Sequence, residues 1–271
     1  MNISQIVAIA TQKLRELESP QKEAELILSH ILKKDRLYLI MNSSEVISKV
    51  NENIFFQLLD RRVAGEPLEY ITNRVSFYSE EFFIDKGALI PRPETELMID
   101  EVLKYAKDGD SILEIGVGSG AVSIMLSKLL KNSKIIGVDI SKDALKIANK
   151  NRELHSAENV TFVESDLFSN ISVKFDIIVS NPPYIADSEE SKLQKELSFE
   201  PKNALYGGEI GDELLKRIVD QFFERDETTL ICEMGYDQRD SMRKYVGDRG
   251  EISFYRDLAG LDRGFTLRKT S

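Results

Sequence analysis

The tetrapeptide Asn181-Pro182-Pro183-Tyr184 is the segment of this sequence with the clearest chemical potential. It follows an apolar stretch, residues 175–180, that is typical of a buried strand. The two prolines fix φ and remove two N–H donors, so the turn is stiff and its carbonyl groups are free. The side-chain oxygen of Asn181 and the carbonyl of Pro182 can therefore accept hydrogen bonds, and Tyr184 adds a flat aromatic face.

Two acceptors beside an aromatic ring suit a planar –NH₂ group, such as that of an amide or of adenine. The nitrogen of such a group is a poor nucleophile because its lone pair is delocalised into the π system. Accepting hydrogen bonds from both N–H groups can turn the lone pair toward an electrophile, and positioning of this kind is a recognised source of rate. The alternative is a purely structural turn that two prolines make rigid.

A second signal is a glycine-rich loop between a predicted strand over residues 111–115 and a predicted helix over 121–130. Its residues are Gly116, Val117, Gly118, Ser119 and Gly120. Glycines let the backbone approach a ligand closely, and the helix that follows offers free N–H groups. The loop also satisfies a loose dinucleotide fingerprint, which would indicate NAD, and it is compatible with a tight turn that binds nothing.

Acidic residues end the next two predicted strands. Asp139 closes the strand that begins at Lys134, about 20 residues past the glycine loop, where a carboxylate can accept hydrogen bonds from ribose hydroxyls. Asp166 and Leu167 follow the third strand, where they could meet the amine and the ring of an adenine. NAD and S-adenosylmethionine both contain adenosine, so this spacing fits either ligand, and Asp139 could instead cap the following helix.

The elements that must position these residues alternate between short apolar strands and helices from residue 110 onward. This alternation predicts βαβ units around a mostly parallel sheet, with an antiparallel hairpin, residues 251–255 and 264–267, at its edge. Ligands of such sheets bind beyond the carboxyl ends of the strands, near the switch in strand order. We therefore expect the glycine loop and the Asn181 turn to follow adjacent strands.

The first part of the chain has a different pattern. Apolar residues recur at helical spacing over 3–17, after Pro20 and over 37–41, and Ser43 or Ser44 could cap a fourth helix. The aromatic-rich stretch over residues 71–90 indicates a β-hairpin. The sequence thus predicts three parts, which are a helical domain (1–70), a hairpin linker (71–90) and an α/β domain (91–271).

Composition restricts the classes of function. The chain has 271 residues, of which 42% are apolar and 30% charged, as in folded proteins. No run approaches the ~18 apolar residues of a membrane span, and the start of the sequence does not resemble a signal peptide. A single cysteine, Cys232, and two histidines argue against a disulfide framework or a metal site. We therefore expect a cytoplasmic protein.

The distribution of charge argues against a general nucleic-acid binder. The net charge is −10, and residues 91–271 carry 25 basic and 33 acidic side chains. Affinity for nucleic acids comes largely from lysine and arginine side chains that neutralise phosphates. An acidic second part instead suits a cationic small molecule or a partner with a neutral or basic surface.

The glycine loop, Asp139 and Asn181-Pro-Pro-Tyr together resemble class I S-adenosylmethionine-dependent methyltransferases that act on planar amines. Other segments resemble more specifically the protein-(glutamine-N5) methyltransferases of peptide chain release factors, the HemK/PrmC family. These segments are residues 65–68, 77–78, 89–96 and 199–201, and the resemblance covers essentially the whole chain. Two features depart from the family pattern, namely Glu114 in place of aspartate and a looser glycine pattern over residues 206–212.

The resemblance implies a Rossmann-like class I methyltransferase domain, with a mostly parallel seven-stranded sheet and an antiparallel edge hairpin, plus a small N-terminal helical bundle. It implies that S-adenosyl-L-methionine is the cofactor, S-adenosyl-L-homocysteine the product, and that no metal is needed. It assigns the cofactor to Gly116, Val117, Gly118, Ser119, Gly120, Asp139, Leu167 and Asn181. It assigns the substrate glutamine to the catalytic residues Asn181, Pro182, Pro183 and Tyr184.

The partner implied by the resemblance is a class 1 release factor, whose Gly-Gly-Gln glutamine would be methylated while the helical domain docks the rest. We expect no direct nucleic-acid or membrane partner, and a monomer. Three alternatives remain, which are an adenine-N6 nucleic-acid methyltransferase, an NAD oxidoreductase and a non-catalytic scaffold. Arg92 and Thr95 either face the cofactor carboxylate or simply begin a helix.

Overall fold

The computed structural model describes residues 1–269, apart from the side chains of Ser191 and Lys192. Its contacts divide the chain into two units. The smaller unit comprises residues 1–74 together with 195–199, and the larger comprises 75–194 together with the residues from 200 onward. The segment 195–199 is joined to the smaller unit by an ion pair of 3.0 Å between Arg62 Nη2 and Glu196 Oε1.

The smaller unit is helical. Its helices are α1 (Ile3–Lys13), α2 (Pro20–Leu32), α3 (Arg36–Met41), α4 (Lys49–Val63) and α5 (Leu68–Thr72). Asn2 and Gln5 form a capping box at the start of α1, and Pro20 occupies the first turn of α2, where a proline costs no hydrogen bond. Their apolar faces close a core that includes Ile6, Ile27 and Phe55.

The predicted cap of the fourth helix is wrong. Neither Ser43 nor Ser44 caps α4, because the helix begins later, at Lys49. Ser48 Oγ accepts the Asn51 N–H at 3.2 Å instead. The intervening residues form a connection that includes an antiparallel bridge between Asn2 and Val46.

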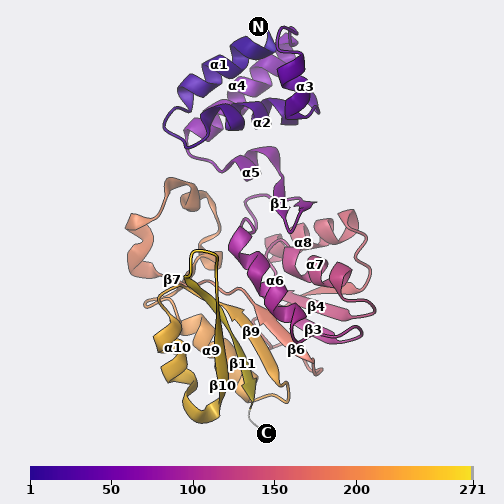
Figure 1. Cartoon of the computed structure of the whole chain (residues 1–271), viewed down its shortest axis with the longest axis vertical. Helices are drawn as coiled ribbons and strands as arrows, with labels where there is room; N and C mark the ends of the chain where they lie inside the picture. Colours follow the sequence, from indigo (N-terminus) through magenta and orange to yellow (C-terminus); the bar gives the residue numbers. More distant parts are fainter. Residues whose placement is uncertain (270–271) are drawn as a thin grey trace. The chain divides into compact units, whose positions relative to one another are not determined.

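The larger unit contains a seven-stranded sheet with the strand order β10-β11-β9-β6-β3-β4-β5 (Figure 1). Its strands are β3 (Ser111–Ile115), β4 (Lys134–Asp139), β5 (Val160–Glu164), β6 (Ile177–Ser180), β9 (Thr229–Glu233), β10 (Gly250–Arg256) and β11 (Asp262–Lys269). Strand β11 runs antiparallel to both of its neighbours, while β9, β6, β3, β4 and β5 pair in parallel. This arrangement confirms the predicted mostly parallel sheet with an antiparallel edge hairpin.

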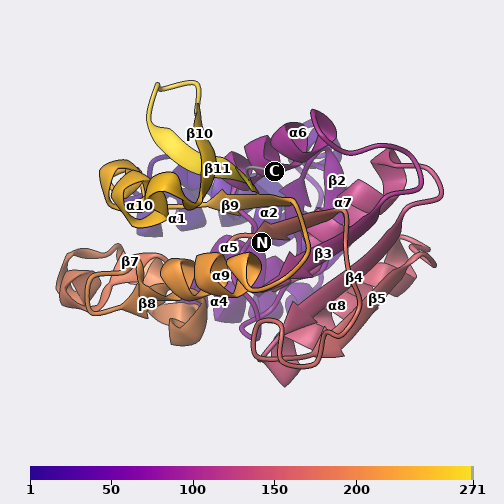
Figure 2. The same cartoon turned by 90° about the horizontal axis from the view of Figure 1, so that it is seen from below.

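Helices cover both faces of the sheet. They are α6 (Glu96–Leu103), α7 (Ala121–Leu129), α8 (Lys142–Leu154), α9 (Glu213–Phe223) and α10 (Arg239–Val246). Figure 2 shows α6 on one side of the strands and α9 on the other. Side chains alternate along a strand, so Leu113 and Ile115 of β3 pack with α9 in one core, whereas Glu114 faces Ser123 of α7.

Shorter elements complete the larger unit. Strands β1 (Val75–Phe77) and β2 (Glu80–Phe82) form a hairpin, and β7 (Ile185–Ala186) pairs in parallel with β8 (Tyr206–Gly208). The 3₁₀ helices are Pro93–Thr95, Asp187–Lys192, Lys202–Ala204 and Gly247–Arg249, and Lys195–Phe199 is a further one in the smaller unit. In the part of the chain that the structure describes, none of the helices is both long and apolar enough to span a bilayer.

Candidate active site

A cavity of about 320 Å³ lies at the carboxyl ends of β3, β4 and β6, at the switch in strand order. Nine of the sequence-predicted residues line it: Gly116, Val117, Gly118, Ser119, Asp139, Leu167, Asn181, Pro182 and Pro183. Two do not, because Gly120 packs toward Phe162 and the Tyr184 hydroxyl turns toward Glu233. As expected, the glycine loop and the Asn181 turn follow paired strands, β3 and β6.

The glycine loop needs its glycines for two different reasons. Gly116, Gly118 and Gly120 have φ angles of 76°, 53° and 79°, a region that other residues rarely adopt. A side chain on Gly120 would place its Cβ atom 2.8 Å from Phe162, so this glycine is also required for packing. A Cβ atom on Gly118 would meet nothing within 4 Å, which leaves the loop surface open to a ligand.

The N–H groups of the loop are largely used within the protein. Those of Gly116 and Val117 donate to the Val138 carbonyl at 2.8 and 3.1 Å. That of Gly118 donates to Asp139 Oδ2 at 2.9 Å. A pyrophosphate-binding loop needs such donors free for its anionic ligand. The loop geometry therefore argues against the NAD alternative and suits a ligand that carries positive charge.

Asp139 braces the loop and still keeps acceptor capacity. Its Oδ1 atom accepts the Ser141 N–H at 2.8 Å, and its Oδ2 atom accepts the Gly118 N–H. Each carboxylate oxygen has more than one acceptor site, so both can accept a further bond from a ligand. Burial raises the pKa of Asp139, and the hydrogen bonds from the backbone oppose that rise.

Glu114 is buried behind the glycine loop. Its Oε2 atom accepts the N–H of Ser123 at 2.9 Å and also the Ser123 hydroxyl. It thus satisfies one of the backbone donors that the first turn of α7 leaves free. Burial raises the pKa of Glu114 to about 8, against the lowering effect of Ser123, and Asp139 raises it further.

Because Glu114 is mostly protonated near pH 7, Glu114→Gln should change stability in a pH-dependent way. A carboxyl group whose pKa is raised on folding favours the native state at low pH, and this contribution is lost as the pH rises to about 8. The free energy of unfolding of the wild type, minus that of Glu114→Gln, should fall by about 1.4 kcal/mol per pH unit between about pH 5 and 8. Urea unfolding of both proteins across this range measures the difference, and a pH-independent difference would contradict it.

The Asn181 turn is oriented by contacts on both sides. Asn181 Nδ2 donates to Thr95 Oγ1 at 3.0 Å, which leaves Oδ1 as the free acceptor of this cavity-lining side chain. The Asn181 carbonyl lies 3.9 Å from where a Cβ atom of Gly116 would be, so the turn stands opposite the glycine loop. The Tyr184 hydroxyl donates to Glu233 Oε1 at 3.3 Å.

Sequence reasoning missed Glu200, although it noted the segment that contains this residue. The buried Glu200 side chain accepts the Ile90 N–H at 3.0 Å and pairs with the cavity-lining guanidinium of Arg92. The Arg92–Glu200 ion pair thus joins residues 89–96 and 199–201, two of the segments whose sequence resembles the HemK/PrmC family. Within residues 1–269, no cluster of three or more His, Cys, Asp or Glu side chains is arranged to hold a metal ion.

Two solved methyltransferase structures have a similar fold. A methyltransferase from Pyrococcus furiosus aligns over 71% of this chain and 90% of its own, with a TM-score of 0.55 and 16% identity. A ribosomal protein L11 methylase from Lactobacillus delbrueckii subsp. bulgaricus aligns over 69% and 84%, with a TM-score of 0.52 and 18% identity. Residues 91–211 also match the family model of the methyltransferase small domain. The larger unit therefore defines a class I methyltransferase with a Rossmann-like fold.

The full-length relatives narrow this class to one family. A release factor glutamine methyltransferase from Buchnera aphidicola subsp. Schizaphis graminum is 38% identical over 97% of this chain and 98% of its own. Its counterpart from Koribacter versatilis is 36% identical over 93% and 92%, and residues 5–72 match the PrmC N-terminal domain. The chain belongs to the family of release factor glutamine methyltransferases.

Proposed function

We propose that this enzyme methylates the side-chain amide nitrogen (N5) of the glutamine in the Gly-Gly-Gln motif of class 1 peptide chain release factors. The names of its full-length relatives support the substrate. The structural observation that carries the proposal is the Asn181 side chain, which lines the cavity with its Oδ1 atom as the free acceptor, opposite the glycine loop.

The residues around the cavity fit S-adenosyl-L-methionine, which when bound supplies a methyl group on a positively charged sulfur. The loop Gly116, Val117, Gly118, Ser119 and Gly120 offers an open surface at Gly118 for the methionine part. Asp139 retains acceptors for both ribose hydroxyls, and Leu167 lines the cavity beyond β5, where it would pack against adenine. No metal is part of this proposal, and S-adenosyl-L-homocysteine is the product.

The catalytic residues orient the nucleophile. Asn181 Oδ1 and the Pro182 carbonyl accept the two N–H bonds of the glutamine amide, and Pro183 keeps the turn rigid. With both N–H bonds held, the lone pair of the nitrogen is oriented for attack. Bound S-adenosyl-L-methionine would supply the methyl group, so that a nitrogen–carbon bond would form as the sulfur–carbon bond breaks, and the surplus amide proton would pass to water. Tyr184 lies outside the cavity lining and holds the end of the turn through its hydroxyl bond to Glu233.

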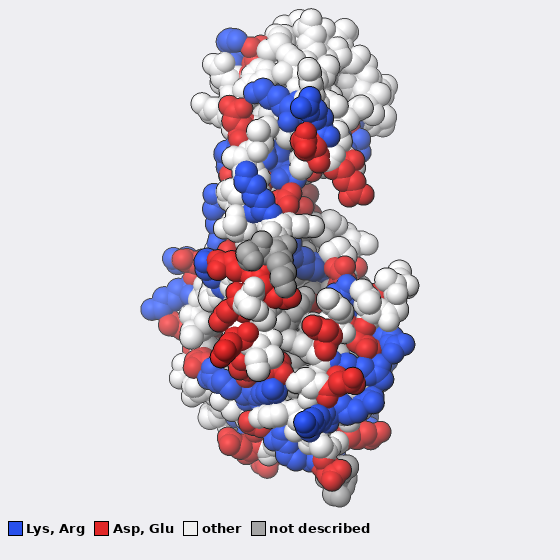
Figure 3. Space-filling view, turned by 90° about the vertical axis from the view of Figure 1, so that its left-hand side faces the viewer, with Lys and Arg blue, Asp and Glu red and all other residues white. Residues whose placement is uncertain are grey.

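We further assign residues 1–70 to docking of the release factor, residues 71–90 to a hairpin linker and residues 91–271 to catalysis. We also propose that the enzyme is a monomer and acts in the cytoplasm. Nucleic acid is not a substrate in this proposal. On the face that Figure 3 shows, acidic and basic side chains are interspersed over the larger unit. Together with the excess of acidic residues in this part of the sequence, this supports a protein substrate.

The proposal is tested by incubating the enzyme with methyl-labelled S-adenosyl-L-methionine and a purified class 1 release factor. Mass spectrometry of the peptides should place one methyl group on the Gly-Gly-Gln glutamine. A release factor with alanine at that glutamine is the control and should stay unlabelled. Label that appears in RNA or DNA, and not in the release factor, would favour the adenine-N6 alternative instead.

A further inference from the structure

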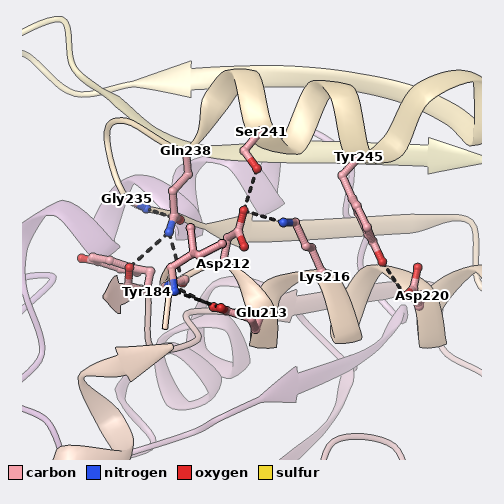
Figure 4. Close-up of polar contacts among 11 residues, drawn as sticks. Tyr184, Asp212, Glu213, Lys216, Asp220, Gly235, Gln238, Ser241 and Tyr245 are labelled. Atoms are coloured by element: carbon pink, nitrogen blue, oxygen red, sulfur yellow. Dashed lines mark hydrogen bonds and ion pairs between the residues drawn. The ribbon is translucent and has the colours of Figure 1, made fainter. Parts of the chain in front are cut away.

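Tyr184, the last residue of the catalytic turn, is held at both ends. Its hydroxyl donates to Glu233 Oε1, and its carbonyl accepts from Gln238 Nε2 at 3.1 Å. The Gln238 amide also donates to the Gly211 carbonyl at 3.1 Å and accepts the Gly235 N–H at 3.0 Å. Figure 4 shows this amide between the turn and the segment before α9. The turn is therefore fixed by side chains as well as by its prolines.

Glu233 ends β9 behind the turn and is only 2% exposed. Its Oε1 atom accepts the Tyr184 bond, while the buried Oε2 atom forms no hydrogen bond of its own among the described residues. Thr95 lowers the pKa of the Glu233 carboxyl group. The Thr95 hydroxyl is thus a donor whose proton the carboxylate can attract.

The polarity of these contacts determines how the Asn181 amide is turned. Thr95 Oγ1 accepts from Asn181 Nδ2, so its own proton must point elsewhere. An ionised carboxylate can only accept, so Glu233 would attract the Thr95 proton and leave Thr95 Oγ1 as the acceptor from Asn181. The Asn181 amide must then present its –NH₂ group to Thr95 and its oxygen to the cavity.

We propose that Thr95 and Glu233 are positioning residues, which hold the Asn181 amide with Oδ1 toward the substrate nitrogen. This inference rests on the proposed function, because it gives Oδ1 its role as acceptor. Neither residue needs to touch the substrate. Thr95 orients Asn181 directly, and Glu233 acts through Thr95 and through the Tyr184 hydroxyl.

Thr95→Val tests the first link, because valine keeps the shape and removes the hydroxyl. Thr266→Val is a matched control, since Thr266 on β11 is equally buried and its hydroxyl donates to Glu101 Oε1 at 2.9 Å, away from the cavity. We expect kcat on the release factor to fall about tenfold or more in Thr95→Val only. Affinity for S-adenosyl-L-homocysteine should stay within about twofold in both variants. Thr95→Ser, which restores the hydroxyl, should recover most of the activity.

Glu233→Gln tests the second link through its pH dependence. Burial raises the pKa of Glu233 to about 7, and Thr95, Tyr184 and Arg263 lower it while Glu94 raises it. Tyr255 of β10 also lies near this carboxylate. The carboxylate is ionised above its pKa, so wild-type kcat should rise as the pH passes about 7 and then level off. Glu233→Gln should lack this rise, and a rise that persists unchanged would refute the role of Glu233.

A measurement without turnover separates this inference from the proposed function. Hydrogen exchange at Asn181 Nδ2, followed by nuclear magnetic resonance, should be slow in the wild type and in Thr266→Val and at least about tenfold faster in Thr95→Val. Unchanged exchange in Thr95→Val would overturn the positioning role even if the enzyme methylates release factors. If the wild type fails to methylate them, the proposed function fails, and the exchange data still decide whether Thr95 orients Asn181.

Discussion

Asn181→Ala is expected to lower kcat for release factor methylation by about 10²–10³-fold, the loss that follows removal of one preorganised hydrogen-bonding group. Alanine removes the acceptor that lines the cavity, so the substrate amide loses one of its two orienting contacts. The contacts that we propose for the cofactor, at the glycine loop and Asp139, remain. Titration calorimetry should therefore find the affinity for S-adenosyl-L-homocysteine within about twofold of wild type.

Two further variants sharpen this test. Asn181→Gln keeps the amide but moves it by one methylene, and it should also lose most of the activity because positioning is what matters. Asn149→Ala removes a half-buried asparagine of α8, whose Nδ2 donates to the Leu145 carbonyl at 2.8 Å, and should leave kcat unchanged. Full methylation of a release factor by Asn181→Ala would remove the basis for assigning this turn to catalysis.

Asp139→Ala is expected to weaken binding of S-adenosyl-L-homocysteine by about 30–100-fold. This range corresponds to about 2–3 kcal/mol, as expected when hydrogen bonds to a charged group are lost. The variant also leaves the N–H groups of Gly118 and Ser141 without the acceptor that they have in the wild type. Calorimetry measures the dissociation constant, and an unaltered value would show that the carboxylate does not hold the ligand.

A ligand analogue separates the ribose contact from the bracing of the loop. A 2′,3′-dideoxy analogue of S-adenosyl-L-homocysteine lacks both hydroxyls and should bind wild type weakly. If Asp139 holds the ribose, the analogue and the parent ligand should bind Asp139→Ala with nearly equal affinity, because the two losses describe the same contact. If instead the loss of affinity caused by Asp139→Ala and the loss caused by removing the hydroxyls simply add, Asp139 acts only by bracing the glycine loop.

The sequence was sufficient to predict the sheet and the two segments that face each other across the cavity. Strands β3 and β4 are nearly continuous apolar runs, and such runs are diagnostic when helices alternate with them. The glycine loop and the Asn181 turn could be placed on adjacent strands because ligand sites of open parallel sheets follow a topological rule. These are local patterns combined with a rule about folds.

The supporting contacts could not be predicted, because each joins residues distant in sequence. Thr95 and Asn181 are 86 positions apart, and Arg92 and Glu200 are 108 apart. The periodicity of a sequence does not predict that two distant polar side chains will share a hydrogen bond. Helix α10 was missed for another reason, since Met242 and Val246 are its only buried residues and give too weak an apolar stripe.

The position of β11 has a consequence for synthesis of the protein. Strand β9 carries Glu233 and is buried along its whole length, yet one of its two neighbours is made about 30 residues later, the kind of distant pairing that delays folding. While residues 262–269 are still inside the ribosome, β9 presents an unpaired apolar edge, which invites association with other chains. Nascent molecules should therefore be most vulnerable to aggregation in this interval, and chaperones that bind extended apolar segments should protect them.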